Sequence, residues 1–181
     1  MTKPKIILNK IQLDLTIKRL MFEIIENYSN IEELAIIGLQ PRGVAFSRSL
    51  KTLLEAEYGK GKIMYGELDI TFYRDDFRRG KDLLVPSKLD IDFDIEDRKI
   101  LLVDDVLYTG RTIRAALDAL ADFGRPAKVE LMTLIDRRYN RELPIEADYV
   151  GQTVDTRITG LKVKVDWDDK DPKVWLIEDK K

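Results

Sequence analysis

Short apolar runs, each followed by polar turn residues, most constrain how this chain can fold. Leu34–Leu39, Ile100–Val103 and Val129–Ile135 have the length and composition of buried strands. Helical periodicity and helix-ending glycines predict helices after the first two runs, at about 43–58 and 111–123. Strands that alternate with helices predict an α/β fold with a central, mainly parallel β-sheet flanked by helices.

Other segments of the 181-residue chain, whose length suits one domain, carry weaker signals. A helix capped by Asn9 is expected to reach about Tyr28, and 62–72 is interpreted as a strand. The charged stretch 74–90 predicts a long flexible loop, and loops of this length tend to be functional. Strand-like pieces of the tail lie near Tyr149, at 162–165 and at 174–177. The residues expected to face inward on the helix at 111–123 are Ile113, Ala116, Leu117 and Leu120.

Composition excludes several kinds of site. The chain has no cysteine and no histidine, so it lacks thiolate ligands, the commonest general base and the commonest zinc ligand. Any metal must therefore be held by oxygen atoms, which suits Mg²⁺. A net charge of -2 does not favour bulk binding to nucleic acid. No apolar run is long enough for a signal peptide or a membrane span, so we expect a cytoplasmic protein.

The stretch Ile100–Thr112 (ILLVDDVLYTGRT) sets two carboxylates beside a turn rich in threonine and glycine. Asp104 and Asp105 are expected where the strand ends, at the edge of the sheet where α/β proteins bind ligands. Backbone N–H groups at the start of the next helix, with threonine hydroxyls, form an anion cradle. Carboxylates would repel a phosphate beside them unless they bind another group, such as the hydroxyls of a sugar or a metal ion. The pattern predicts a ligand that carries phosphate together with a sugar or a metal.

Simpler interpretations of this stretch stay open. The acids can be an ordinary acidic loop, with Thr109 and Thr112 only capping a helix. A bacterial receiver domain also has adjacent aspartates after a strand, but there the strand is the first of the domain, whereas about a hundred residues precede this pair. The turn is not a Walker motif, because no Gly-Lys-Ser/Thr follows it.

The stretch resembles the phosphoribosyl pyrophosphate (PRPP) signature of type I phosphoribosyltransferases. Across nearly the whole chain the sequence is similar to the PyrR family of pyrimidine operon attenuators, which are also uracil phosphoribosyltransferases. The matching segments besides the central motif are 37–43 (IGLQPRG), 66–76 (GELDITFYRDD), 135–151 (IDRRYNRELPIEADYVG) and the N-terminal helix. The resemblance implies a type I phosphoribosyltransferase fold over 1–181, with a flexible catalytic loop at about 74–90 and a small hood over the base site at about 136–181.

The resemblance also implies roles for individual residues. Asp104 and Asp105 are implied to hold the ribose hydroxyls and Mg²⁺. The implied cradle for the 5′-phosphate is Val106, Leu107, Tyr108, Thr109, Gly110, Arg111 and Thr112. The implied pyrophosphate site is Pro41, Arg42 and Gly43, with Arg74 arriving on the flexible loop. The implied uracil site is Asp136, Arg137 and Val154. Pro41 and the Arg138-Tyr139-Asn140 segment depart from the family pattern.

The function that the resemblance implies is the transfer of phosphoribosyl from PRPP to uracil, giving UMP and pyrophosphate. It also implies a homodimer or higher oligomer that senses UMP or UTP and regulates pyrimidine genes by binding the leader of pyr mRNA. At positions expected to face RNA, five residues depart from the pattern of the family: Lys18, Phe22, Glu146, Gln152 and Thr153. We therefore expect weak or absent RNA binding. The alternatives are a purely regulatory RNA-binding attenuator with vestigial activity and a phosphoribosyltransferase for another base.

Overall fold

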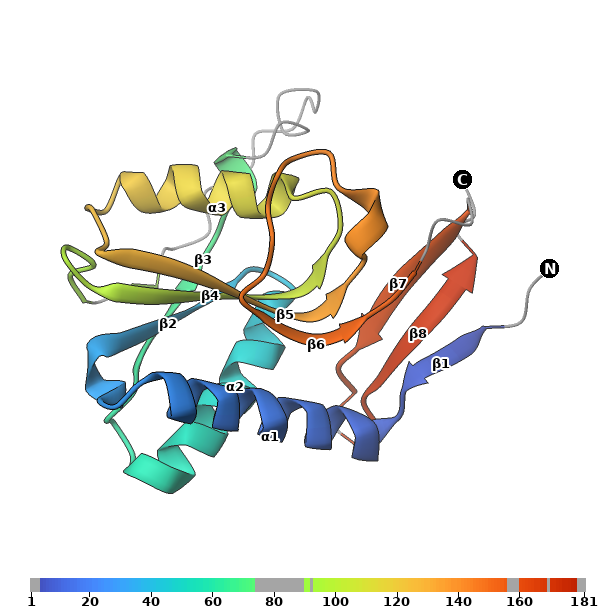
Figure 1. Ribbon diagram of the computed structural model, residues 1–181, viewed down its shortest axis with the longest axis horizontal. Coiled ribbons are helices and arrows are strands. Elements are labelled where there is room, and N and C mark those ends of the chain that lie inside the picture. The colour runs from blue at the N-terminus through green and yellow to red at the C-terminus, as the bar shows by residue number, and fades with distance from the viewer. Residues whose placement is uncertain (1–3, 74–89, 92, 156–159, 169, 179–181) are drawn as a thin grey trace.

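A computed structural model of the chain describes residues 4–73, 90–91, 93–155, 160–168 and 170–178. Its larger sheet has five strands in the order β3-β2-β4-β5-β6, and neighbouring strands are all parallel (Figure 1). The strands are β2 (Leu34–Leu39), β3 (Met64–Leu68), β4 (Lys99–Leu107), β5 (Lys128–Asp136) and β6 (Tyr149–Thr153). The carboxyl ends of all five strands therefore lie along one edge, and the predicted α/β fold is confirmed.

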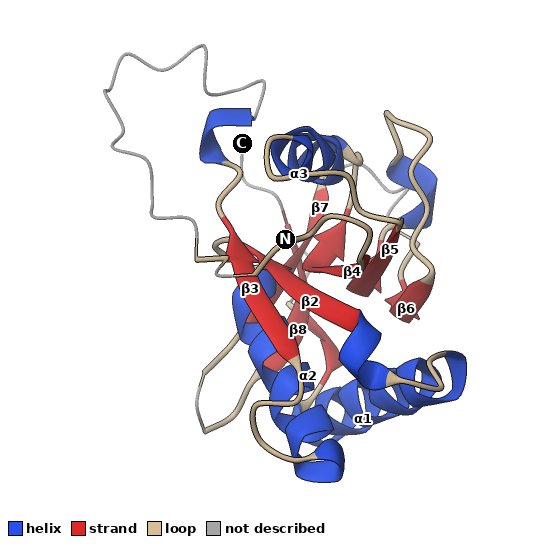
Figure 2. Cartoon of the chain, turned by 90° about the vertical axis from the view of Figure 1, so that its left-hand side faces the viewer, coloured by secondary structure: helices blue, strands red, loops and turns tan. Residues whose placement is uncertain are grey.

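Three α-helices cover this sheet. They are α1 (Lys10–Asn27), α2 (Gly43–Tyr58) and α3 (Arg111–Ala121). Figure 2 shows α1 and α2 on one side of the strands and α3 on the other. The helix predicted after Asn9 is confirmed, because Asn9 and Gln12 form a capping box at its start. Short 3₁₀ turns occur at Ile31–Glu33, Thr71–Tyr73 and Arg138–Asn140.

A smaller antiparallel sheet stands beside the larger one (Figure 1). Its order is β1-β8-β7, with β1 at Lys5–Leu8, β7 at Leu161–Asp166 and β8 at Lys173–Glu178. The strand-like pieces of the tail are confirmed, whereas β1 had no prediction. Val163 and Val174 are buried in the same apolar cluster as α1 and α2. This shared cluster fixes the smaller sheet against the larger one.

The core forms one layer on each face of the larger sheet. In β4, Leu101 and Val103 pack with α1 and α2, whereas Ile100 and Leu102 pack with α3. This alternation follows from the two-residue period of a strand, and β4 is buried on both faces because helices cover both. A strand of this kind has a rigid backbone, which fixes the position of the side chains at its carboxyl end.

The acidic pair lies inside a strand, contrary to the sequence prediction that β4 ends at Val103. Pairing with β5 continues from Asp104 opposite Thr133 to Leu107 opposite Asp136. Because β5 still offers partners there, the extended backbone of β4 does not stop at the first carboxylate. Both carboxylates are therefore held on a paired strand and not on a loop.

Three further predictions need correction or fall outside the described residues. The strand expected at 62–72 is only Met64–Leu68, and a 3₁₀ turn follows it. Leu117 is 42% exposed and does not face inward. The buried face of α3 is centred near Ala116, since Ala115 and Ala119 are also buried, and Leu117 lies about 100° further round the helix. Of the flexible loop predicted at 74–90, with Arg74, residues 74–89 lie outside the described part.

Candidate active site

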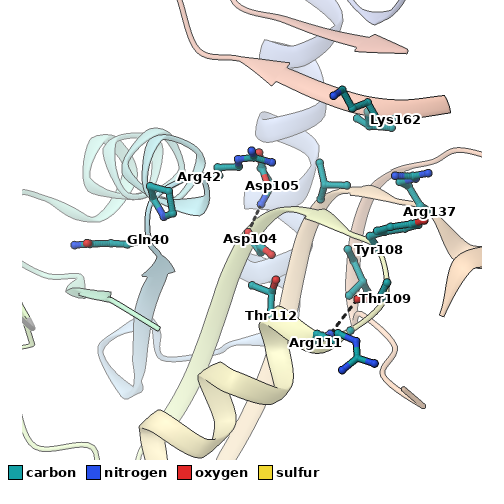
Figure 3. Close-up of a pocket in the computed structure, with 15 residues that line it drawn as sticks. Gln40, Arg42, Asp104, Asp105, Tyr108, Thr109, Arg111, Thr112, Arg137 and Lys162 are labelled. Carbon is teal, nitrogen blue, oxygen red and sulfur yellow. Dashed lines mark hydrogen bonds between the residues drawn. The ribbon is translucent and has the colours of Figure 1, made fainter. Parts of the chain in front are cut away.

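A cavity of about 520 Å³ opens where the carboxyl ends of β2, β4 and β5 meet the smaller sheet (Figure 3). The turns after Leu39 and Ile135, which are about a hundred residues apart in sequence, both reach it. Its lining consists of Gln40, Pro41, Arg42, Asp104, Asp105, Val106, Leu107, Tyr108, Thr109, Gly110, Arg111, Thr112, Arg137, Lys162 and Val163. Gly43, Asp136 and Val154 lie beside this lining and not in it. The structure therefore brings most of the predicted site residues into one cavity.

Asp104 and Asp105 form the acidic floor of the cavity. They are only 6% and 5% exposed, and the amide of Asp105 donates a hydrogen bond of 2.9 Å to Oδ1 of Asp104. Burial raises the pKa of Asp105 to about 6, and the positive charge of Arg42 opposes this rise. The pair can accept hydrogen bonds from hydroxyl groups or bind a hard cation.

The turn after β4 has the geometry of an anion cradle. Gly110 adopts a φ of +91°, which favours glycine, and α3 begins at the next residue. The amide of Arg111 donates to Oγ1 of Thr109 at 3.4 Å, and the amide of Leu107 donates to the hydroxyl of buried Thr133 at 3.1 Å. The residues from Thr109 to Thr112 line the cavity, so the backbone N–H groups at the start of α3 and the threonine hydroxyls favour an anion such as phosphate there.

A segment at 141–145 supports this turn from behind. The carbonyl oxygen of Thr109 accepts hydrogen bonds from the amides of Glu142 and Leu143, at 3.0 and 3.1 Å. A Cβ atom added at Gly110 would lie 3.3 Å from side-chain atoms of both Leu143 and Ile145. The side chains of Arg111 and Glu142 also form an ion pair at 2.7 Å. The turn is therefore fixed by residues that follow it by about thirty positions.

Asp136 and Arg141 connect the end of β5 to the same turn. Asp136 is 2% exposed, and its carboxylate pairs with the guanidinium of Arg141. Arg141 also donates to the carbonyl oxygens of Leu107 and Tyr108, at 3.2 and 2.7 Å. The carbonyl oxygen of Asp136 accepts a bond of 2.8 Å from the amide of Val154. The Asp136 carboxylate thus orients Arg141 and does not face the cavity.

Arg137 joins the turn to the smaller sheet. Its side chain stacks on the ring of Tyr108 at 3.8 Å from the ring centroid. Its Nη2 donates to the carbonyl oxygen of Leu161 at 2.9 Å, and its amide donates to Leu107 at the same distance. Because Arg137 is only 6% exposed, its guanidinium is held rigidly in this place.

The loop after β2 forms the third wall of the cavity. The Gln40–Pro41 peptide bond is cis, and the amide of Gln40 donates to Leu68 at 2.9 Å. Behind it, buried Glu67 pairs with Arg48 at 2.7 Å and accepts a bond from Gln40 Nε2 at 3.4 Å. A Cβ atom at Gly43 would lie 2.3 Å from the carbonyl oxygen of Val103. The close approach that requires glycine at Gly43 is therefore with β4.

Sequence reasoning missed Lys162, Val163 and the roles of Arg141 and Glu67. Gln40 lies in the segment 37–43 that resembles the pyrophosphate loop, and the structure places it in the cavity lining. Lys162 and Val163 had no such signal, since β7 is far in sequence from the other walls. Within the described part of the chain, no helix is both long and apolar enough to cross a membrane.

Comparison with known proteins assigns the family. The model of the phosphoribosyl transferase domain matches residues 5–169. The chain is 44% identical over 177 residues to the "Bifunctional protein PyrR" of Elusimicrobium minutum, covering 96% of this chain and 97% of that protein. It is 54% identical over 138 residues to the protein of the same name from Desulfosudis oleivorans, covering 76% of each.

The fold agrees with this assignment. A crystal structure of a hypoxanthine-guanine phosphoribosyltransferase from Bacillus anthracis matches with a TM-score of 0.66 at 18% identity, covering 84% of this chain and 85% of that one. This likeness shows the type I phosphoribosyltransferase fold that the sequence predicted. The chain therefore belongs to the phosphoribosyl transferase domain family and, within it, to the PyrR family.

Proposed function

We propose that the protein is a uracil phosphoribosyltransferase, which joins uracil to C1 of PRPP and releases pyrophosphate to give UMP. The observation that carries the proposal is the direct succession of two buried carboxylates and an anion cradle along 104–112. In PRPP the ribose hydroxyls and the 5′-phosphate are only a few bonds apart. A site for both must place carboxylates and amides next to each other, as this stretch does. The name shared by the relatives supports the same function.

Each wall of the cavity has a role in this proposal. Asp104 and Asp105 accept hydrogen bonds from the ribose hydroxyls, and the turn Val106–Thr112 binds the 5′-phosphate. Arg42, with the loop at Pro41 and Gly43, binds the pyrophosphate. Arg74, which lies outside the described residues, is proposed to reach the same group. Arg137 borders the uracil, Asp136 and Val154 support this wall from beside the lining, and the smaller sheet forms the hood over it.

Mg²⁺ fits the donor groups of this site. Among the residues that the structure describes, no cluster of three or more acidic, histidine or cysteine side chains could hold a metal ion by itself. Mg²⁺ is commonly bound by one or two carboxylates together with substrate oxygens, and Asp104 and Asp105 offer that number. When bound, Mg²⁺ would supply positive charge that offsets the charge of the pyrophosphate.

The reaction breaks the bond between C1 and the pyrophosphate oxygen, which keeps the electron pair, and forms a bond from C1 to N1 of uracil. Positive charge develops on the ribose, and the adjacent carboxylates stabilise it. Negative charge develops on the pyrophosphate, and the guanidinium of Arg42 stabilises it. The N1 proton leaves the uracil, and the chain has no histidine to accept it. The proton acceptor is therefore pyrophosphate, a carboxylate or water.

An assay of PRPP consumption tests the substrate. The purified protein is incubated with PRPP, Mg²⁺ and, in separate reactions, uracil, hypoxanthine, guanine or orotate. We expect turnover with uracil and little with the other three. A clear preference for any other base would overturn the assignment, and the absence of turnover with every base would favour a purely regulatory protein.

Regulation by RNA is a second candidate function, which the word "bifunctional" in the relatives' name favours. The exposed face of α1 carries Ile11, Leu15 and Phe22 beside Lys18, and Glu146 is also exposed. Apolar and acidic groups do not bind phosphates, so we propose that any affinity for a pyr leader is weak. A gel-shift titration with the leader of its own operon, with and without UMP, measures it. A nanomolar complex that UMP strengthens would refute this proposal.

Two further properties are part of the proposal. The resemblance to PyrR proteins supports a homodimer or a higher oligomer in the cytoplasm, with UMP or UTP as the sensed nucleotide. Analytical ultracentrifugation at several protein concentrations tests the oligomer. Sedimentation as a monomer at all of them would contradict it.

A further inference from the structure

Lys162 is a cavity residue to which neither the motifs nor the comparisons give a role. It lies on β7, the edge strand of the smaller sheet, and lines the cavity together with its neighbour Val163. Figure 3 shows Lys162 across the cavity from Thr112 and Arg111, above Arg137. Its position is thus opposite the turn that the proposed function assigns to the 5′-phosphate.

The backbone of Lys162 is fixed on both sides. The preceding carbonyl, of Leu161, accepts a 2.9 Å hydrogen bond from Arg137 Nη2. The following residue, Val163, is 8% exposed and belongs to the main apolar cluster. Lys162 itself is in register with Ile177 of β8. A side chain on such a support reaches a defined part of the cavity.

The chemistry of displacement at C1 determines which part of the substrate lies there. The incoming base and the departing pyrophosphate must be on opposite faces of C1. With the pyrophosphate at the loop of Pro41 and Arg42 and the 5′-phosphate at the turn before α3, the side bordered by Arg137 and Lys162 is left for the base. Uracil presents two carbonyl oxygens, both hydrogen-bond acceptors, and lysine offers three donors.

We infer that Lys162 is a base-binding residue, whose ammonium group donates a hydrogen bond to a carbonyl oxygen of uracil while its aliphatic stem covers the ring. This inference rests on the proposed function of the cavity. Lysine is suited to both tasks, because its four methylene groups pack on apolar surface while its charged end bonds to a polar group. A hydrogen bond from a charged donor is about twice as strong as a neutral one.

Steady-state kinetics of three variants test the inference. Lys162→Met keeps the length of the stem and removes the charge, Lys162→Arg keeps a charged donor, and Lys164→Met is the matched control. Lys164 is on the same strand, is exposed and does not line the cavity. We expect Lys162→Met to raise the KM for uracil about tenfold, equivalent to about 1.4 kcal/mol, with the KM for PRPP within about twofold of wild type. Lys162→Arg is expected to recover part of the loss, and Lys164→Met to resemble wild type.

Sulfur-substituted bases distinguish direct contact from an indirect effect. Sulfur accepts hydrogen bonds weakly, so wild type should discriminate against 2-thiouracil or 4-thiouracil, and Lys162→Met should lose that discrimination. An unchanged KM for uracil in Lys162→Met would overturn the inference. A rise in the KM for PRPP alone would also overturn it, because the charge would then serve the pyrophosphate.

A binding experiment separates failure of this inference from failure of the proposed function. Calorimetric titration of wild type and Lys162→Met with UMP needs no turnover. If wild type lacks activity with uracil, the proposed function fails, yet weaker UMP binding by Lys162→Met still supports contact with the base. If wild type is active and both proteins bind UMP equally, only the inference about Lys162 fails.

Discussion

The guanidinium group of Arg141 donates a hydrogen bond of 2.7 Å to the carbonyl oxygen of Tyr108. The same group pairs with the carboxylate of Asp136 at the end of β5 and is only 18% exposed. One side chain therefore holds the turn that faces the cavity against a neighbouring strand. Since the Asp136 carboxylate is only 2% exposed, solvent cannot compensate for the loss of its bond to Arg141.

Replacing Arg141 with glutamine is expected to lower the free energy of unfolding by about 3 kcal/mol, because the buried charge of Asp136 loses its partner. For a chain of this size that loss lowers Tm by about 6–12 °C. Arg138→Gln is the control, since Arg138 reaches the same carboxylate at 3.6 Å but is 55% exposed. Its expected cost is below about 1 kcal/mol. Equal Tm values for the two variants in calorimetry would contradict the role given to Arg141.

Asp104→Asn and Asp105→Asn are each expected to reduce kcat/KM for PRPP by about a hundredfold or more, because the carboxylates act on charge that develops in the transition state. The PRPP-consumption assay with uracil measures the change. Asp118→Asn is the control, since Asp118 is exposed on α3, where it pairs with the surface side chain of Arg114 at 2.7 Å. Near-normal turnover in both active-site variants would show that the acidic pair is not the ribose site.

Asp105 should make stability depend on pH. The folded protein keeps the Asp105 proton up to a pKa of about 6, whereas the unfolded chain releases it near 3.8. The folded state thus binds more protons between these values, and its stability falls as pH rises through this window. The side chain of Asp105→Asn is uncharged at every pH. We therefore expect the free energy of unfolding of this variant to exceed that of wild type by up to about 3 kcal/mol at pH 8 and by little at pH 4.

Urea unfolding of both proteins in EDTA-containing buffer, between pH 4 and pH 8, measures this difference. A stability difference that does not change with pH would mean that Asp105 is not held in its protonated form by burial. The expected combination of higher stability and lost activity would show that the site keeps a buried charge for function and not for folding.

Gly43→Ala should damage both the fold and the site. The added methyl group would lie 2.3 Å from the carbonyl oxygen of Val103, a backbone atom held in β4. We expect a loss of about 2–3 kcal/mol by overpacking and a higher KM for PRPP, since the loop after β2 must move away from the acidic pair. Gly61→Ala, where φ is +76° and no atom lies within 4 Å, should cost about 1 kcal/mol and leave KM unchanged. Identical KM values for the two variants would refute the link between Gly43 and the site.

The sequence by itself determined the elements whose signals are local. The strand at Leu34–Leu39 and the helix at Gly43–Tyr58 match their predictions, because a short apolar run and a helical period depend only on neighbouring residues. The same holds for the turn at Thr109–Thr112, in which Gly110 alone indicates a positive φ. These local signals were sufficient to indicate the fold and a site for a sugar phosphate.

Only the tertiary structure decided how the walls of the cavity are held. The acidic pair became part of β4 because β5 continues to pair beyond Val103. Arg141 supports a turn that precedes it by 33 residues, and Lys162 reaches the cavity from a separate sheet. Such contacts join residues that are distant in the chain, and no local pattern encodes them. They form because apolar side chains are buried, and buried polar groups find hydrogen-bond partners, only when the whole molecule is packed.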